Sequence, residues 1–163
     1  MSSHISKLSG NDAEEEDYLE DMFIHVFQTT NSSQRSLQKT VLFIIEHYDY
    51  SLLLARCWGR EVLNTERNLH TIVLFQILDG VHQKCVEESK ANIIWHFQMM
   101  LDYVFEKLVT GCTDLKLLKY IEKMLDVWKA RSVYKPKQLE HYKKLIGEVI
   151  KSLEATSPKY MQK

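Results

Sequence analysis

Apolar residues recur at three- and four-residue steps along most of the chain, a spacing typical of amphipathic α-helices. The pattern begins at Ala13, and the first predicted helix has an apolar face made of Leu19, Met22, Phe23, Val26 and Phe27. Polar or turn-forming residues interrupt the pattern at 30–33, 49–50 and 64–65, at Gly111, and just before Pro136. The breaks predict seven or eight helices of about 15–20 residues with loops of about two to five, which are ordinary connection lengths.

The segment 69–81 differs from the other predicted helices because it is apolar on most sides. Its apolar residues are Leu69, Ile72, Val73, Phe75, Ile77, Leu78 and Val81. A helix of this kind is expected at the centre of a fold, with neighbours on several faces. The other helices have one apolar face each, so they could stack around it as a superhelical array or as a compact bundle.

The composition supports one helical domain. The chain has 163 residues, of which 45% are hydrophobic and 26% charged, with only five glycines and two prolines. These fractions exclude a collagen-like or wholly disordered chain, and so few turn residues argue against a β-sandwich or propeller. We predict a disordered lead at 1–12, a helical domain at 13–154 and a flexible tail at 155–163.

Charge is unevenly distributed although the formal net charge is only −1. Residues 12–21 include seven acidic and no basic side chains, whereas residues 113–151 include ten basic against five acidic ones. The basic region could receive an anion, although a solvated helix face explains it equally well. No apolar run reaches the ~18–20 residues needed to span a bilayer, and the polar N-terminus does not have the pattern of a signal peptide.

Motifs of catalysis and metal binding are absent from the sequence. There is no glycine-rich phosphate loop, no G-x-S-x-G and no H-E-x-x-H. His47, His82 and His96 fall on apolar helices and are interpreted as packed or boundary residues. The three cysteines are far apart, which fits reduced thiols in a cytosolic or nuclear compartment. We therefore expect a binding module with no cofactor and no metal, and not an enzyme.

Two stretches of the chain carry a resemblance to a known family. The first comprises the segment SQRSLQ at 33–38, Tyr48, WGRE at 58–61 and NTER at 64–67. The second is the segment IEKMLDVWKARSVY at 121–134. In this order they resemble the CTD-interacting domain (CID), the helical module that reads the heptad-repeat tail of RNA polymerase II. The resemblance runs from about residue 17 to 147 and is closest to the regulation-of-nuclear-pre-mRNA-domain proteins and related yeast transcription-termination factors.

The resemblance implies an all-α fold, a right-handed superhelical array of seven to eight helices like those of CID and ENTH/VHS-type domains. It also implies a groove in which the tail peptide forms a β-turn and its phosphoserine at heptad position two meets a basic side chain. The segment FQILDGVHQK at 75–84 is similar to a helix-four motif of the family. Asp79 then takes the place of an Asp or Asn that hydrogen-bonds the peptide turn, which a carboxylate can do as an acceptor.

The resemblance places Lys123 where close relatives have an arginine that contacts the phosphate. A lysine can still form a charge-assisted hydrogen bond of about 1.5–3 kcal/mol. It lacks the planar fork that grips a phosphate with two hydrogen bonds, so we expect weaker or less selective phosphate recognition. Lys119, one turn earlier, and Arg131, two turns later, are further candidates for this contact, although simple solvation would explain both.

The apolar part of the implied site includes Val127, which aligns with an aliphatic residue facing the peptide tyrosine and could equally be a core residue. Two positions depart from the family: Gln76 replaces a tyrosine, and Lys84 replaces an asparagine or glutamine. Both are expected to line the groove, so altered or lost tail binding is an alternative. Trp128 and Tyr134 match the family and are interpreted as packing residues.

The implied function is a nuclear module that binds the polymerase tail in transcription elongation, transcription termination or RNA 3′-end processing. An alternative with the same fold is a scaffold subunit of a nuclear complex, for example a polymerase-tail kinase, whose groove is altered or inactive. A third hypothesis is a membrane-trafficking domain of the ENTH/VHS type, but an acidic first helix is unsuited to anionic lipid. The expected partners are the tail peptide and subunits of a nuclear complex, with no membrane. RNA binding is left open.

Overall fold

The computed structural model describes residues 10–88 and 91–156. This part of the chain contains seven α-helices and one short 3₁₀ turn, which confirms the predicted all-α superhelical array. The helices are α1 (Gly10–Thr29), α2 (Gln34–Glu46), α3 (Ser51–Asn64), α4 (Asn68–Glu88), α5 (Ala91–Thr110), α6 (Leu115–Ala130) and α7 (Pro136–Thr156), with the turn η2 (Tyr48–Tyr50) before α3. Helix α1 begins three residues before the predicted start. The predicted lead and tail lie largely outside the described residues.

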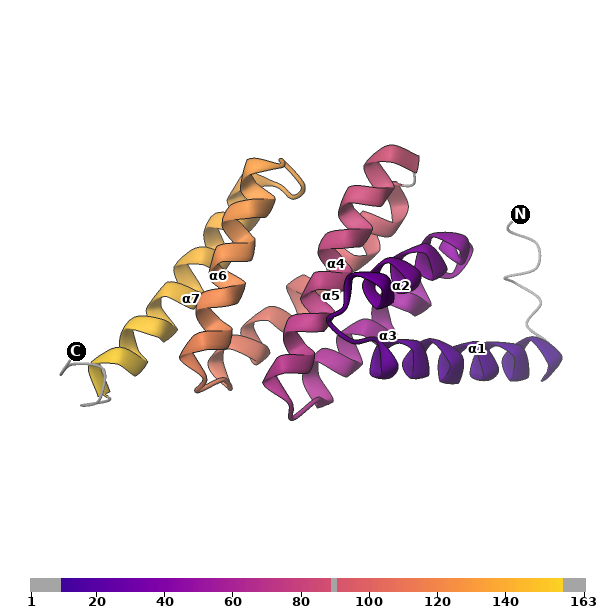
Figure 1. The fold of residues 1–163 in the computed structure, drawn as a ribbon, viewed down its shortest axis with the longest axis horizontal. Helices are drawn as coiled ribbons and strands as arrows, with labels where there is room; N and C mark the ends of the chain where they lie inside the picture. The colour runs from indigo at the N-terminus through magenta and orange to yellow at the C-terminus, as the bar shows by residue number, and fades with distance from the viewer. Residues whose placement is uncertain (1–9, 89–90, 157–163) are drawn as a thin grey trace.

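The helices follow a repeating neighbour rule: each packs against the helix two places further along the chain. Helix α1 packs on α3, α3 on α5, and α5 on α7, while α2 packs on α4 and α4 on α6. Contacts of α4 with α5 and of α6 with α7 join the two rows. The chain therefore advances steadily from α1 at one end of an elongated molecule to α7 at the other (Figure 1).

Several helix ends are set by local sequence. The hydroxyl of Ser33 accepts a hydrogen bond from the backbone N–H of Ser36 and caps the start of α2. The carboxylate of Asp114 caps α6 in the same way, by accepting from backbone N–H groups of its first turn. Pro136 is the first residue of α7, where a missing N–H costs nothing. Gly111 follows the last residue of α5, as predicted.

Helix α4 is the centre of the core, as its apolar sequence predicts. Phe75, Leu74 and Leu78 are fully buried, whereas Leu69 in its first turn is 78% exposed. The indole N–H of Trp58 in α3 donates to the backbone carbonyl of Leu74, 2.8 Å away, so a buried polar group is satisfied. Helices α2 and α6 both pack against α4.

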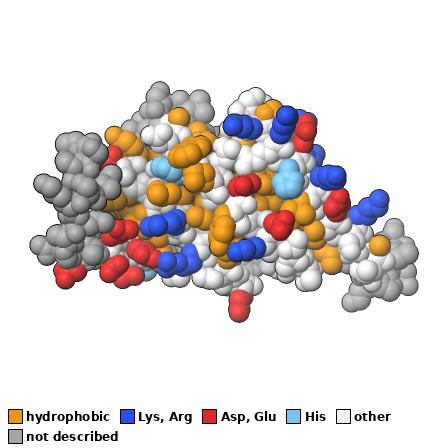
Figure 2. Space-filling model, turned by 180° about the vertical axis from the view of Figure 1, so that it is seen from behind, with side chains coloured by type: hydrophobic (Ala, Val, Ile, Leu, Met, Phe, Trp, Pro, Cys, Tyr) orange, Lys and Arg blue, Asp and Glu red, His pale blue; other side chains and the backbone are white. Residues whose placement is uncertain are grey.

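Charged and apolar side chains gather on different parts of the surface. Figure 2 shows acidic side chains gathered towards the α1 end and apolar side chains across the middle of the face that it displays. Within the acidic helix, Glu16 pairs with Arg56 at 3.4 Å and Glu20 pairs with Arg60, both across to α3. The acidic run is thus partly neutralised by the neighbouring helix. No helix in the described ranges is long and apolar enough to cross a membrane.

Candidate functional site

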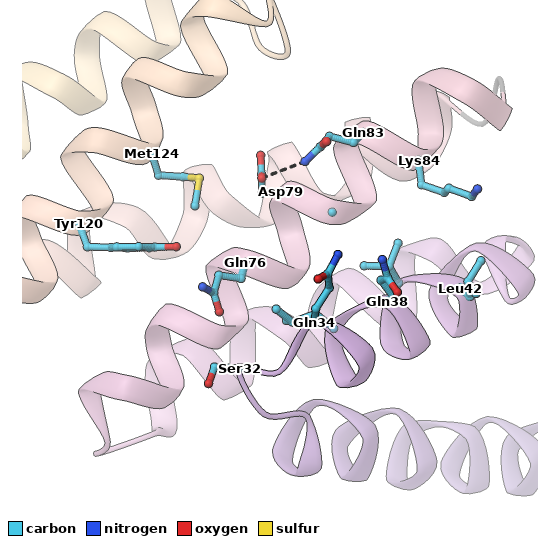
Figure 3. Close-up of a pocket in the computed structure, with 13 residues that line it drawn as sticks. Ser32, Gln34, Gln38, Leu42, Gln76, Asp79, Gln83, Lys84, Tyr120 and Met124 are labelled. Atoms are coloured by element: carbon cyan, nitrogen blue, oxygen red, sulfur yellow. Dashed lines mark hydrogen bonds between the residues drawn. The ribbon is translucent and has the colours of Figure 1, made fainter.

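A groove lies between α2, α4 and α6, on the side of α4 that these helices share (Figure 3). Its volume is about 670 Å³. The residues lining it are Ser32, Gln34, Leu37, Gln38, Val41 and Leu42 from α2 and its approach, Gln76, Asp79, Gly80, Gln83 and Lys84 from α4, and Tyr120 and Met124 from α6. The lining combines neutral amides and apolar side chains with the charged residues Asp79 and Lys84, so it can bind a ligand that has both apolar and polar groups.

The close approach of α2 to α4 at the floor of the groove depends on Gly80. A Cβ atom at this position would lie 2.7 Å from Cγ2 of Val41, which is closer than side-chain atoms can pack. Glycine in the middle of a helix costs about 0.5–1 kcal/mol relative to alanine. Because Gly80 stands inside a 21-residue helix, that cost is offset by the contact with α2 that it permits.

Asp79 lies in the groove and both of its carboxylate oxygens are hydrogen-bonded. Oδ1 accepts from the indole Nε1–H of Trp128 at 3.0 Å and from the guanidinium of Arg131 at 2.6 Å. Oδ2 accepts from the side-chain amide of Gln83 at 3.1 Å (Figure 3). The side chain of Asp79 is 19% exposed, so it remains accessible to a ligand although it is held in place.

Gln76 and Tyr120 face the groove from opposite helices, and the Tyr120 hydroxyl points into the space between α6 and α4 (Figure 3). Burial raises the pKa of this hydroxyl, while a hydrogen bond from Gln76 acts in the opposite direction. The Oε1 atom of Gln76 is buried and has no hydrogen-bond partner within the described structure. An acceptor of this kind can be satisfied by a donor that a ligand brings.

The three predicted phosphate contacts are placed differently. Lys123 is exposed and makes no ion pair with any described residue; on the helix it lies beside Tyr120, three residues earlier. Lys119 pairs with Glu154 of α7 at 3.2 Å. Arg131, just after α6, pairs with Asp79. None of these three cations is among the residues that line the groove. Lys123 directly precedes the lining residue Met124 on α6, and of the three it alone has no ion pair with a described residue to break.

Val127 is half-buried and packs against the core, outside the residues that line the groove. Met124 is the apolar α6 side chain in the lining. Sequence reasoning missed Met124 and Tyr120, as well as Gln34, Gln38 and Gln83. For Tyr120 and Met124 the sequence did contain a signal, because they are four residues apart and so lie on one face of α6.

A buried polar cluster lies next to Asp79 and away from solvent. Nε2 of His82 and the hydroxyl of Tyr134 are hydrogen-bonded at 2.5 Å, and both side chains pack edge-on against the ring of Trp128. Burial, followed by the nearby charge of Arg131, lowers the pKa of His82 to about 3. His82 is thus a packed residue, as the sequence predicts, and its lowered pKa keeps it neutral. No group of three His, Cys, Asp or Glu side chains in the described ranges is arranged to hold a metal ion.

A family model described as the CID domain matches residues 21–142, which is most of the chain. The chain therefore belongs to the CID family, whose members are helical binding modules that generally bind the C-terminal tail of RNA polymerase II.

Among known proteins, the chain is similar to "Regulation of nuclear pre-mRNA domain-containing protein 1A". It is 27% identical to the Homo sapiens protein over 116 residues, which is 71% of this chain and 36% of that protein. The Gallus gallus protein is 26% identical over 116 residues, 71% of this chain and 42% of that protein. The chain thus spans only about a third of the length of the first of these relatives.

Among solved structures, the fold is similar to the CTD-interacting domain of Seb1 from S. pombe. The two match with a TM-score of 0.65 at 15% sequence identity, over 84% of this chain and 97% of the Seb1 chain. At this identity the match shows the fold alone.

Proposed function

We propose that the groove between α2, α4 and α6 binds the heptad-repeat tail of RNA polymerase II, phosphorylated at heptad position two. The chain would then act in the nucleus, in transcription elongation, transcription termination or RNA 3′-end processing. The observation that carries this proposal is Asp79, which matches the family motif and is held at an accessible position in the groove. The name of the protein 1A relatives, with its reference to nuclear pre-mRNA, supports the same setting.

Asp79 accepts a hydrogen bond from the turn of the bound peptide. Its carboxylate has about four acceptor positions, and three donors from the described residues occupy it. One position is thus left for an N–H or hydroxyl of the ligand. The amides of Gln34, Gln38 and Gln76 supply further neutral hydrogen-bonding groups, which suit a tail rich in hydroxyl side chains.

Lys123 is the phosphate contact in this proposal. It is exposed, it directly precedes the lining residue Met124, and it has no ion-pair partner in the described structure to release before it meets an anion. Arg131 and Lys119 would have to leave Asp79 and Glu154, so their contribution to phosphate binding is smaller. Because Lys123 is the main cation, phosphorylation strengthens binding by the ~1.5–3 kcal/mol of a charged hydrogen bond at most.

Fluorescence anisotropy with a labelled two-repeat tail peptide, with and without phosphate at position two, tests the proposal. Lys123→Ala should remove most of the preference for the phosphorylated peptide, and Asp79→Ala should weaken binding of both forms. Lys129→Ala is the matched control, because Lys129 is an exposed lysine nine residues from Tyr120 and so on the opposite side of α6. Absence of binding by either peptide below about millimolar concentration, where the free energy of binding is only about −4 kcal/mol, refutes the proposal.

A second candidate function is a scaffold subunit of a nuclear complex, for example a polymerase-tail kinase, with an altered or inactive groove. Gln76 and Lys84, which depart from the family pattern, both line the groove and support this candidate. A stable complex with a defined protein partner, together with no binding of the tail peptide, would favour the scaffold. Weak binding of the tail peptide would favour the tail-binding function instead, because the many repeats of the tail raise the effective affinity.

A further inference from the structure

Among the described residues that donate a hydrogen bond to Asp79, Trp128 is the one whose side chain is fully buried. Trp128 is fully buried, whereas Arg131 and Gln83, the other two donors, are exposed side chains. Long exposed side chains exchange between rotamers readily, so their hydrogen bonds restrict the carboxylate only weakly. The direction of the Asp79 carboxylate therefore depends chiefly on the indole.

The indole is itself fixed from three sides. It stacks on Phe75 with ring centres 6.3 Å apart and an interplanar angle of 12°. His82 and Tyr134 press their edges against it, with ring centres at 5.1 and 5.5 Å. The hydrogen bond between His82 and Tyr134 ties these two rings to each other. The Nε1–H of Trp128 is thus a donor with a single direction, and it reaches Asp79 from 49 residues away in the sequence.

We propose that Trp128 is a positioning residue for the ligand-binding carboxylate: it holds Asp79 Oδ1 so that Oδ2 is oriented to accept one donor from a bound peptide. The inference rests on the proposed function. It assigns to Trp128 a part in affinity that packing alone would not give it. It also assigns a ligand chemistry to this point of the groove, an N–H or an unmodified hydroxyl, because a carboxylate repels a phosphate placed there.

The pre-arranged carboxylate raises affinity because the ligand does not have to order it on binding. Removing only the indole N–H should weaken peptide binding by about three- to tenfold, the range that ordering one side chain at an interface represents. The loss should act entirely through Asp79. In a protein without that carboxylate, the same change in Trp128 should leave affinity unaltered.

The test is a double-mutant cycle on the affinity of the two-repeat peptide phosphorylated at position two. The variants are Trp128→Phe, Asp79→Ala and the double variant, with anisotropy as the measurement. Trp58→Phe is the matched control, because Trp58 is also fully buried and also donates its indole N–H, but to the Leu74 carbonyl in the core. We expect Trp58→Phe to lower the melting temperature without changing affinity.

The outcomes separate the two proposals. Non-additive losses, with the double variant no weaker than Asp79→Ala, support the inference. Additive losses, or equal losses in Trp128→Phe and Trp58→Phe, overturn it while leaving the proposed function in place. No binding by the wild-type protein overturns the proposed function, and the inference with it.

If Trp128→Phe does not fold, the wild-type protein and Asp79→Ala provide the measurement instead. The indole N–H resonance of Trp128 in a ¹H–¹⁵N spectrum should shift when the wild-type protein is saturated with peptide. It should not shift when Asp79→Ala is saturated. An indole resonance that responds equally in both proteins, or in neither, overturns the inference.

Discussion

His82 should make the stability of the domain fall as the pH is lowered through the weakly acidic range. Its side chain is 1% exposed, and its Nδ1 atom is buried without a hydrogen-bond partner among the described residues. Protonation would place a charge and a second N–H donor at a site that offers neither water nor an acceptor. Burial accordingly lowers the pKa of His82 from 6.5 to about 3.

The size of the effect follows from this shift. The unfolded chain binds a proton at His82 as the pH falls below 6.5, whereas the folded protein does not until the pH nears 3. His82 therefore costs no stability well above pH 6.5, and below that pH it lowers the free energy of unfolding progressively. Between pH 7.5 and pH 5 the loss is about 2 kcal/mol, which corresponds to about 4–8 °C in Tm for a domain of this size.

The assay compares thermal and urea unfolding of the wild-type protein with His82→Gln at pH 7.5, 6 and 5. Glutamine does not titrate and can still hydrogen-bond Tyr134, so the variant should lack this part of the pH dependence. Burial also lowers the pKa values of His70 and His96, but both are present in the two proteins and their effects cancel in the difference. Equal losses of stability in the two proteins between pH 7.5 and 5 would refute the reasoning.

Two further substitutions test the packing and the helix ends. Gly80→Ala should destabilise the fold by about 1–3 kcal/mol, because the new Cβ would overlap Val41 across the floor of the groove. Urea unfolding measures the loss. Adding Val41→Ala to the same protein should restore part of it, because the overlapping methyl groups are then removed. Ser33→Ala should cost about 1 kcal/mol by removing the cap of α2. A melting temperature unchanged by Ser33→Ala, with Ser33→Asp as the capping control, would contradict the second prediction.

The helices could be predicted because their determinants are local. A three- and four-residue apolar spacing, a capping Ser33, a Pro136 at a first turn and a Gly111 after a last turn each act within one or two turns of helix. The central place of α4 was predictable for the same reason, since a segment apolar on most sides must be covered on most sides. The start of α1 at Gly10 was missed because Gly10, Asn11 and Asp12 have low helix propensity and none of them is apolar, so they do not extend the apolar face.

The groove was predictable only where the family pattern pointed to it. Asp79 and Gln76 were placed in the lining by the resemblance, and the structure locates both there. The resemblance also named Arg131 and Lys119, but it could not show that they pair with Asp79 and Glu154. Those pairs join residues on different helices, and the periodicity of a single helix carries no information about them.

The number of helices to within one, their apolar faces, a packed His82 and the resemblance to the family could all be inferred from the sequence. These properties depend on near neighbours in the chain or on ordered motifs. The tertiary structure was needed to show which groups meet: that Trp128 hydrogen-bonds Asp79, and that Lys119 and Arg131 are paired whereas Lys123 has no ion pair with a described residue. The physical reason is that hydrogen-bond direction and access to solvent are set by the superhelical packing of α2, α4 and α6, which brings together residues ~40–50 positions apart.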